Sequence, residues 1–256
     1  MNLVKYFSKQ NNIYKWFKWE INIDLLVAII TLILTAFAYY GNGHWFESSE
    51  VLTLLIFIIG TNIVVNVIFP IWWVAFYRKQ SLADLGVTKK GWIMSIGLGI
   101  ILALIRSYHL PALVNGINWV PHIIFSAIIL WEPFFVFGWL QSRYEKAFGV
   151  LPGILLAAFS MAFYHIGTYP FHDLIKLFLI YLISAACYRI KKNLLVLWPV
   201  YWSISSSVNS LSGGMRFGWD AVVVYSVVLA IQLCYLCYAL KKSNAREKAI
   251  SSSILQ

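Results

Sequence analysis

The sequence predicts an all-α, multipass transmembrane helical bundle with about eight spans. Of the 256 residues, 61% are hydrophobic and only 12% are charged. The charged residues gather in short segments between long apolar runs, a pattern typical of a chain that crosses a membrane repeatedly. The net charge of +10 does not indicate nucleic-acid binding, because most Lys and Arg residues occupy the predicted loops, where they set orientation.

The first part of the chain divides into an interfacial segment and two transmembrane helices. Residues 1–22 contain four lysines interleaved with aromatic side chains, which is typical of a cytoplasmic segment at the membrane surface. Residues 23–80 hold two apolar runs, over 23–40 and 51–77. The first run is too long for a typical signal peptide, so we expect an uncleaved anchor, and Pro70 is expected to kink the second helix.

Residues 81–212 form the predicted core. It begins with a polar loop and a third span over 92–105. The next segment, 107–121, has prolines near both ends and is better explained as an irregular outer loop or re-entrant piece than as a full span. Four further spans are predicted, over 122–148, 152–165, 174–188 and 194–210.

Residues 213–256 are predicted to contain an eighth span, over 220–240, and a basic tail. With eight spans, 17 of the 20 Lys and Arg residues fall on one side of the membrane. Positively charged loops face the cytoplasm, so we expect a cell-membrane protein with both termini cytoplasmic.

Two ionisable side chains lie deep inside apolar runs. Glu132 is the only carboxylate in such a position, and His165 is one of few histidines there. Ionisable groups at membrane depth are costly and usually functional. If the fourth helix continues to Phe148, the helical rise puts Glu132 about 24 Å and His165 about 20 Å from the cytoplasmic level. If the helix stopped at Gln141, the two depths would differ by about 10 Å.

The seventh predicted span is unusually polar, and Ser205 and Asn209 lie at about 17 and 22 Å on the same scale. Its serines have a simpler explanation in hydrogen bonds between helices, but together with Glu132 and His165 they modestly favour a water-accessible cavity. There Glu132 and His165 could polarise a water molecule, with Ser and Asn groups holding an oxyanion. A proton relay or structural Glu–His pair explains the same residues equally well.

The stretch WEPFFVFGWLQSRYEKAFGVLPGILLAAFSMAFYH resembles two motifs of the CAAX protease and bacteriocin-processing (CPBP, or Abi) family of intramembrane proteases. These motifs are E-E-x-x-x-R-G-[FW]-L-Q and F-x-x-x-H, followed by H-x-x-x-N on a later helix. The resemblance covers residues 81–210 and implies an all-helical bundle. It also implies that Glu132 activates water, that His165 acts with it, and that Asn209 helps to hold the oxyanion.

The sequence departs from the family pattern at four positions. Pro133 replaces the second glutamate and Phe137 the arginine of the first motif. Met161 replaces the phenylalanine of the second motif, and Ser205 replaces the distal histidine, so it could donate one hydrogen bond but not act as a cation. Because Glu132 and His165 supply two ligands and catalytic zinc normally has three from the protein, no cofactor is predicted and metal dependence stays open.

The sequence is therefore consistent with two main functions. The first is a divergent CPBP-type endopeptidase, a hydrolase that acts on a membrane-associated peptide or protein. The alternative is a catalytically silent family member that binds a membrane-protein partner, for example in bacteriocin immunity or envelope assembly. A transporter ranks third, because no internal repeat and few further buried charges are visible.

Overall fold

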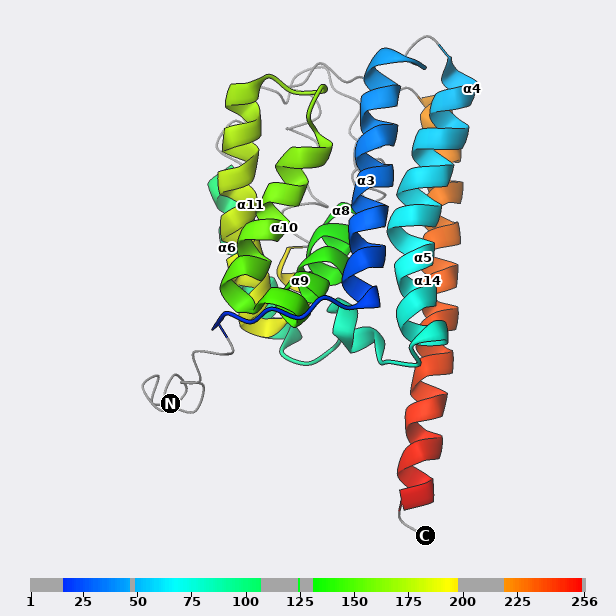
Figure 1. Ribbon diagram of the computed structural model, residues 1–256. Helices are drawn as coiled ribbons and strands as arrows, with labels where there is room; N and C mark the ends of the chain where they lie inside the picture. Colours follow the sequence, from blue (N-terminus) through cyan, green and yellow to red (C-terminus); the bar gives the residue numbers. More distant parts are fainter. Residues whose placement is uncertain (1–15, 47–48, 107–123, 125–130, 198–218, 255–256) are drawn as a thin grey trace.

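The computed structural model describes residues 16–46, 49–106, 124, 131–197 and 219–254 (Figure 1). All regular elements of these residues are helical, which confirms the all-α prediction. Beyond the helices, the described residues contain one isolated bridge between Ile166 and Tyr169. The elements are α3 (Ile23–His44), α4 (Glu50–Leu52), η1 (Thr53–Ile68), α5 (Phe69–Ile71), η2 (Trp72–Tyr77), η3 (Leu82–Leu85), α6 (Trp92–Arg106), α8 (Trp131–Pro133), η5 (Phe134–Gln141), α9 (Ser142–Phe148), α10 (Val150–Tyr164), α11 (Phe171–Lys191), η6 (Leu194–Val196) and α14 (Trp219–Ile254).

Three helical segments of the described chain are long and apolar enough to cross a membrane. They are Ile23–His44, Thr53–Tyr77 and Val222–Arg246, of 22, 25 and 25 residues. These segments indicate membrane association. The apolar parts of α6 and α10 are shorter than a full span, with 15 residues in α10.

Helix α3 begins at a polar cap and packs through a polar stripe. The Asn22 side chain accepts a hydrogen bond from the backbone N–H of Leu25, which satisfies one free donor of the first turn. Thr35 donates to the side-chain oxygen of Asn66 in η1 over 2.8 Å, and both side chains are fully buried. This bond connects the first two long apolar helices at a fixed register, and Asn66 therefore faces α3.

The second helix runs without a break from α4 to η2. Its turns are partly widened: the N–H of Phe69 donates to Val64 O and that of Arg78 to Trp73 O, each five residues back. Pro70 lies in the short α-helical turn between the two widened stretches. Near the end of this helix, Arg78 forms an ion pair of 3.0 Å with Asp24, which connects the second helix to the first turn of α3.

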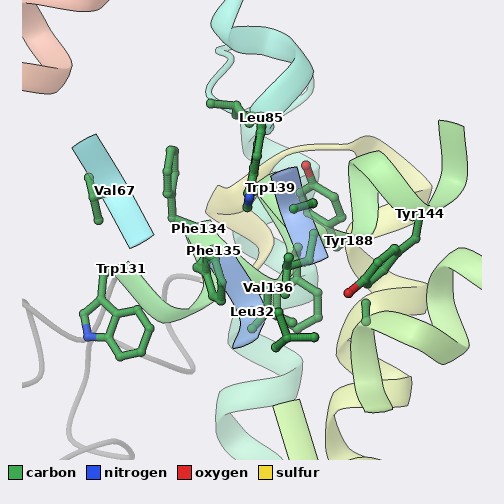
Figure 2. Close-up of a cluster of buried hydrophobic side chains, with 14 of the residues drawn as sticks. Leu32, Val67, Leu85, Trp131, Phe134, Phe135, Val136, Trp139, Tyr144 and Tyr188 are labelled. Carbon is green, nitrogen blue, oxygen red and sulfur yellow. The ribbon is translucent and has the colours of Figure 1, made fainter. Parts of the chain in front are cut away.

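A single helix made of α8, η5 and α9 passes through the centre of the molecule. Its residues from Trp131 to Glu145 are buried, and Figure 2 shows several of its side chains packed against Leu32 of α3, Val67 of η1 and Leu85 of η3. The helix continues to Phe148, as the convergence of Glu132 and His165 requires. It ends at Gly149, whose φ of +91° and contact with the backbone of residue 16 leave no room for a Cβ.

Arg143 lies in the predicted fourth helix, in the part that the charge count assigns to the cytoplasmic side. The structure places it inside α9, where it is only 1% exposed. Its guanidinium lies 4.6 Å from the centre of the Trp139 ring, one turn earlier on the helix. The long side chain is thus covered by its own helix and by neighbouring elements, a placement that charge counting does not detect.

Several predicted helix ends also move. The fifth helix starts at Val150 instead of Pro152, and the sixth, α11, extends from Phe171 to Lys191. Helix α14 has 36 residues, so the predicted basic tail continues the last helix as far as Ile254. Of the predicted seventh span, the described residues include the short turn η6 and Leu197; Ser205 and Asn209 lie outside the described residues.

Candidate functional site

The Glu132 carboxylate lies between three helices. Glu132 belongs to α8 and is 8% exposed. The Tyr164 hydroxyl, at the end of α10, donates to its Oε1 over 2.9 Å, and the Tyr181 hydroxyl of α11 donates to its Oε2 over 2.9 Å. Each carboxylate oxygen therefore has a donor from a different helix, which offsets part of the cost of burying the group.

His165 approaches the same carboxylate from the end of α10. It forms the C-cap of this helix, and its Nδ1 lies 2.8 Å from the backbone carbonyl of Met161. Because a carbonyl oxygen only accepts, Nδ1 must be the donor, and a neutral imidazole then has its lone pair on Nε2. Nε2 lies 4.0 Å from Oε1 of Glu132.

This arrangement brings two acceptors face to face when the histidine is neutral. Hydrogen bonds of about 2.8 Å allow one water to donate to both Nε2 and Oε1 across such a gap. The water oxygen would then have its lone pairs directed away from both partners. A proton on the imidazole would instead give a direct ion pair. The geometry therefore suits either water activation or the movement of a proton between Glu132 and His165.

Aromatic rings surround the pair. The ring of Tyr39, from α3, lies 4.9 Å from both the Tyr164 ring and the His165 ring, measured between centroids. On another side, the Tyr169 ring lies 5.1 Å from that of His165. With His165 only 5% exposed, these rings exclude most water and strengthen electrostatic interactions inside the site.

The predicted proximity of Glu132 and His165 is confirmed by the 4.0 Å separation. Ser205 and Asn209 lie outside the described residues, so their relation to the pair stays a prediction. Tyr164 and Tyr181 were not predicted. Tyr164 directly precedes His165 in the sequence, and Tyr181 lies on the next predicted helix. The chain has 15 tyrosines, and nothing else in the sequence distinguishes these two from the others.

Two departures from the motif contact these tyrosines. Phe137, where the family has arginine, stacks on Tyr181 with ring centroids 5.5 Å apart and an interplanar angle of 16°. The Tyr164 hydroxyl also lies 2.6 Å from the sulfur of Met161, where the family has phenylalanine. Phe137 and Met161 therefore each contact a tyrosine that donates a hydrogen bond to Glu132.

The residues described here include no group of three His, Cys, Asp or Glu side chains arranged to hold a metal ion. Glu132 and His165 would supply two ligands to such an ion. Catalytic zinc sites normally use three protein ligands, so the described pair alone does not form one.

No protein-family model, curated protein or solved structure matches this chain. Its function is therefore inferred from the side chains around Glu132 and from the resemblance of the motif that contains it.

Proposed function

We propose that the protein is a divergent CPBP-type intramembrane endopeptidase that cleaves a membrane-associated peptide with a water molecule activated by Glu132. The observation that supports this most strongly is the buried Glu132–His165 pair, 4.0 Å apart, with His165 Nδ1 bound to Met161 O. A general base must reach the proton it removes directly or through one water, and this pair offers a water position within that distance.

In the proposed reaction, the water attacks the carbonyl carbon of the scissile peptide bond and Glu132 takes one of its protons. Nε2 of His165 accepts the other O–H of the water and so orients it. The carbonyl oxygen becomes an oxyanion, for which the resemblance assigns Asn209, with one more hydrogen bond available from Ser205. When the C–N bond breaks, Glu132 returns the proton to the leaving nitrogen, which restores the carboxylate.

The same proposal includes eight membrane spans with both termini in the cytoplasm. It is supported by the concentration of Lys and Arg residues in alternate loops and by the three long apolar helices. Helices α6, α10 and α11 and the central helix are the additional spans among the described elements. The predicted core of the protease, residues 81–212, contains both Glu132 and His165.

A second candidate is a catalytically silent member of the family that binds a membrane protein, as an immunity or envelope-assembly factor would. The observation that favours it is the pair of tyrosine bonds to Glu132, one to each oxygen. Such bonds join α8, α10 and α11, and a purely structural tie between helices would have the same form. Pro133, Phe137 and Ser205 also depart from the family pattern.

The two candidates are separated by replacing one buried carboxylate at a time in the full-length protein. Membranes from cells expressing the wild type, Glu132→Gln or Glu145→Gln at matched abundance are compared by mass spectrometry of protein N-termini. We expect new N-termini in membrane proteins with the wild type and with Glu145→Gln, but not with Glu132→Gln. Identical N-termini for the wild type and Glu132→Gln, at equal abundance, would reject the peptidase and leave the binding protein.

A further inference from the structure

A large cavity lies beside α8, apart from the Glu132 pair. Its volume is about 900 Å³. Trp131, Pro133 and Phe134 of the central helix line it, together with residues of η1, η3 and α14, whereas Glu132 and His165 do not. The cavity is therefore a separate feature on a different face of the helix.

The lining changes in character along the cavity. The part between the central helix, η1 and α14 is apolar except for Gln232, and the end near residues 81–89 is polar. The apolar part includes Val67, Ile71, Phe134, Leu229, Leu233 and Leu236. The polar end includes Ser81, Thr88, Lys89, Asn193, Ser243 and Asn244.

Specific contacts hold the polar residues at one end of the molecule. The Asn193 side chain donates to the carbonyls of Thr88 and Lys90 over 2.9 and 3.1 Å. Arg246 of α14 donates to the carbonyl of Ala75 over 2.8 Å, which brings this part of α14 to the end of η2. Figure 1 shows the segment around residues 81–89 at the level of the middle of α14.

This end is also strongly basic. Lys89 lines the cavity itself. The neighbouring carboxylate of Asp84 is already paired with Lys146 at 3.0 Å. The other cations on the segments that form this end are Arg78, which is paired with Asp24, and Lys79, Lys90, Lys241, Lys242 and Arg246.

We propose that the cavity binds an anionic phospholipid, with one acyl chain between α14 and the central helix and the phosphate group near Lys89. An acyl chain has no polar atoms to leave unpaired in the apolar part, whereas an extended peptide there would leave backbone N–H and C=O groups without partners. The basic end favours a negative headgroup over a zwitterionic one. In a bilayer, the phosphate of a phospholipid lies at the boundary between the apolar core and the polar surface, which matches the change from apolar to polar lining along the cavity.

Photolabelling tests the site. The purified full-length protein is reconstituted in phosphatidylcholine vesicles with a small fraction of photoreactive lipid, either phosphatidylglycerol or phosphatidylcholine with a diazirine on one acyl chain. Peptide mass spectrometry should find the label on α14 between Leu229 and Leu240 and on residues 194–195. Phosphatidylglycerol should label these peptides about fivefold more than phosphatidylcholine, the factor expected for one basic residue near an anionic lipid.

Two matched pairs of variants assign the label to the cavity. Lys89→Glu should lower the preference for phosphatidylglycerol much more than Lys90→Glu does, because Lys89 lines the cavity and Lys90 does not. Leu236→Trp should reduce labelling by filling the apolar part. Val227→Trp should not, since Val227 does not line the cavity and is 54% exposed.

Equal labelling by both lipids would overturn the proposal. So would labelling of the exposed face of α3 to the same degree as α14, because it would indicate lipid surrounding the whole protein. Unchanged labelling in Lys89→Glu would contradict it even if Leu236→Trp failed to fold, since Lys89 is at the surface. None of these results depends on peptidase activity.

Discussion

Glu132 and Glu145 lie on the same central helix and are equally buried, each 8% exposed, yet they have different partners. Glu145 is paired with the cations of Arg189 and Lys192, at 3.2 and 3.1 Å, and accepts a hydrogen bond of 2.9 Å from Gln141. Glu132 has two neutral hydroxyl donors and an imidazole nitrogen at 4.0 Å.

The difference shows that one residue type has two kinds of surroundings in one helix. The cations beside Glu145 compensate its charge permanently and connect α9 to the end of α11, so this group stabilises the bundle. Among the partners described for Glu132, the two hydroxyls donate hydrogen bonds and carry no charge, and the facing imidazole lies at a distance that one water could bridge. Burial alone therefore does not distinguish a site from a structural pair; the identity of the partners does.

If the proposed peptidase function holds, the largest expected effect is on catalysis at Glu132. Glu132→Gln should lower the rate of cleavage of a membrane substrate by about 10²–10⁴-fold, the usual contribution of a general base. Its free energy of unfolding should change by less than about 1 kcal/mol, because the glutamine oxygen still accepts a tyrosine bond. The rate is measured on a substrate found by N-terminal mass spectrometry, and stability by SDS titration in mixed micelles. A small loss of rate with a large loss of stability would reverse the roles of the two glutamates.

Removing the carboxylate of Glu145 should mainly affect stability. Glu145→Ala leaves Arg189 and Lys192 without their partner, and loss of one member of a buried pair typically costs several kcal/mol. Because these cations are 33% and 44% exposed, water compensates in part, and we expect a loss of about 2 kcal/mol. The same SDS titration measures it. Cleavage per folded molecule should stay at the wild-type level, and a selective fall in that rate would place Glu145 in the site.

The tyrosine donors should have intermediate effects. Tyr164→Phe or Tyr181→Phe keeps the ring and removes one hydrogen bond to a charged oxygen, which costs about 1.5 kcal/mol. In the double variant we expect a non-additive loss, since both hydroxyls act on one carboxylate. A double-mutant cycle with Glu132→Gln should show coupling for each tyrosine. Additive losses in every cycle would mean that the hydroxyls stabilise the helices independently of Glu132.

The smallest effect is expected at a more exposed ion pair. Lys146 and Asp84 lie 3.0 Å apart with side chains 40% and 39% exposed. Lys146→Ala should therefore lower the free energy of unfolding by only about 0.5 kcal/mol, and high salt should reduce the difference further. This variant gives the baseline against which the loss in Glu145→Ala is judged. If Lys146→Ala lost as much stability as Glu145→Ala, exposure would not explain the difference between the two ion pairs.

The sequence was sufficient to predict the all-α class and the Glu132–His165 pair, because ionisable groups are rare inside apolar runs. Their convergence depended on the length of the central helix, since nothing in the sequence between Gln141 and Phe148 decides where the helix ends. Tyr164 and Tyr181 could not be predicted, because tyrosine is common in this chain and its hydroxyl acquires a role only through tertiary placement. The burial of Arg143 could not be predicted for a related reason: charge favours exposure, but its guanidinium lies over the Trp139 ring inside the bundle.

The length of α14 has a further consequence. Its 36 residues extend about 54 Å at the α-helical rise, whereas the hydrocarbon core of a bilayer is about 30 Å thick. If its apolar part crosses a bilayer along the normal, about 24 Å of this helix projects beyond the hydrocarbon. Figure 1 shows the C-terminal part of α14 extending past the rest of the bundle. The projecting turns would then form a helical spacer that holds Ile254 away from the lipid headgroups. The basic side chains on these turns would be within reach of large soluble probes.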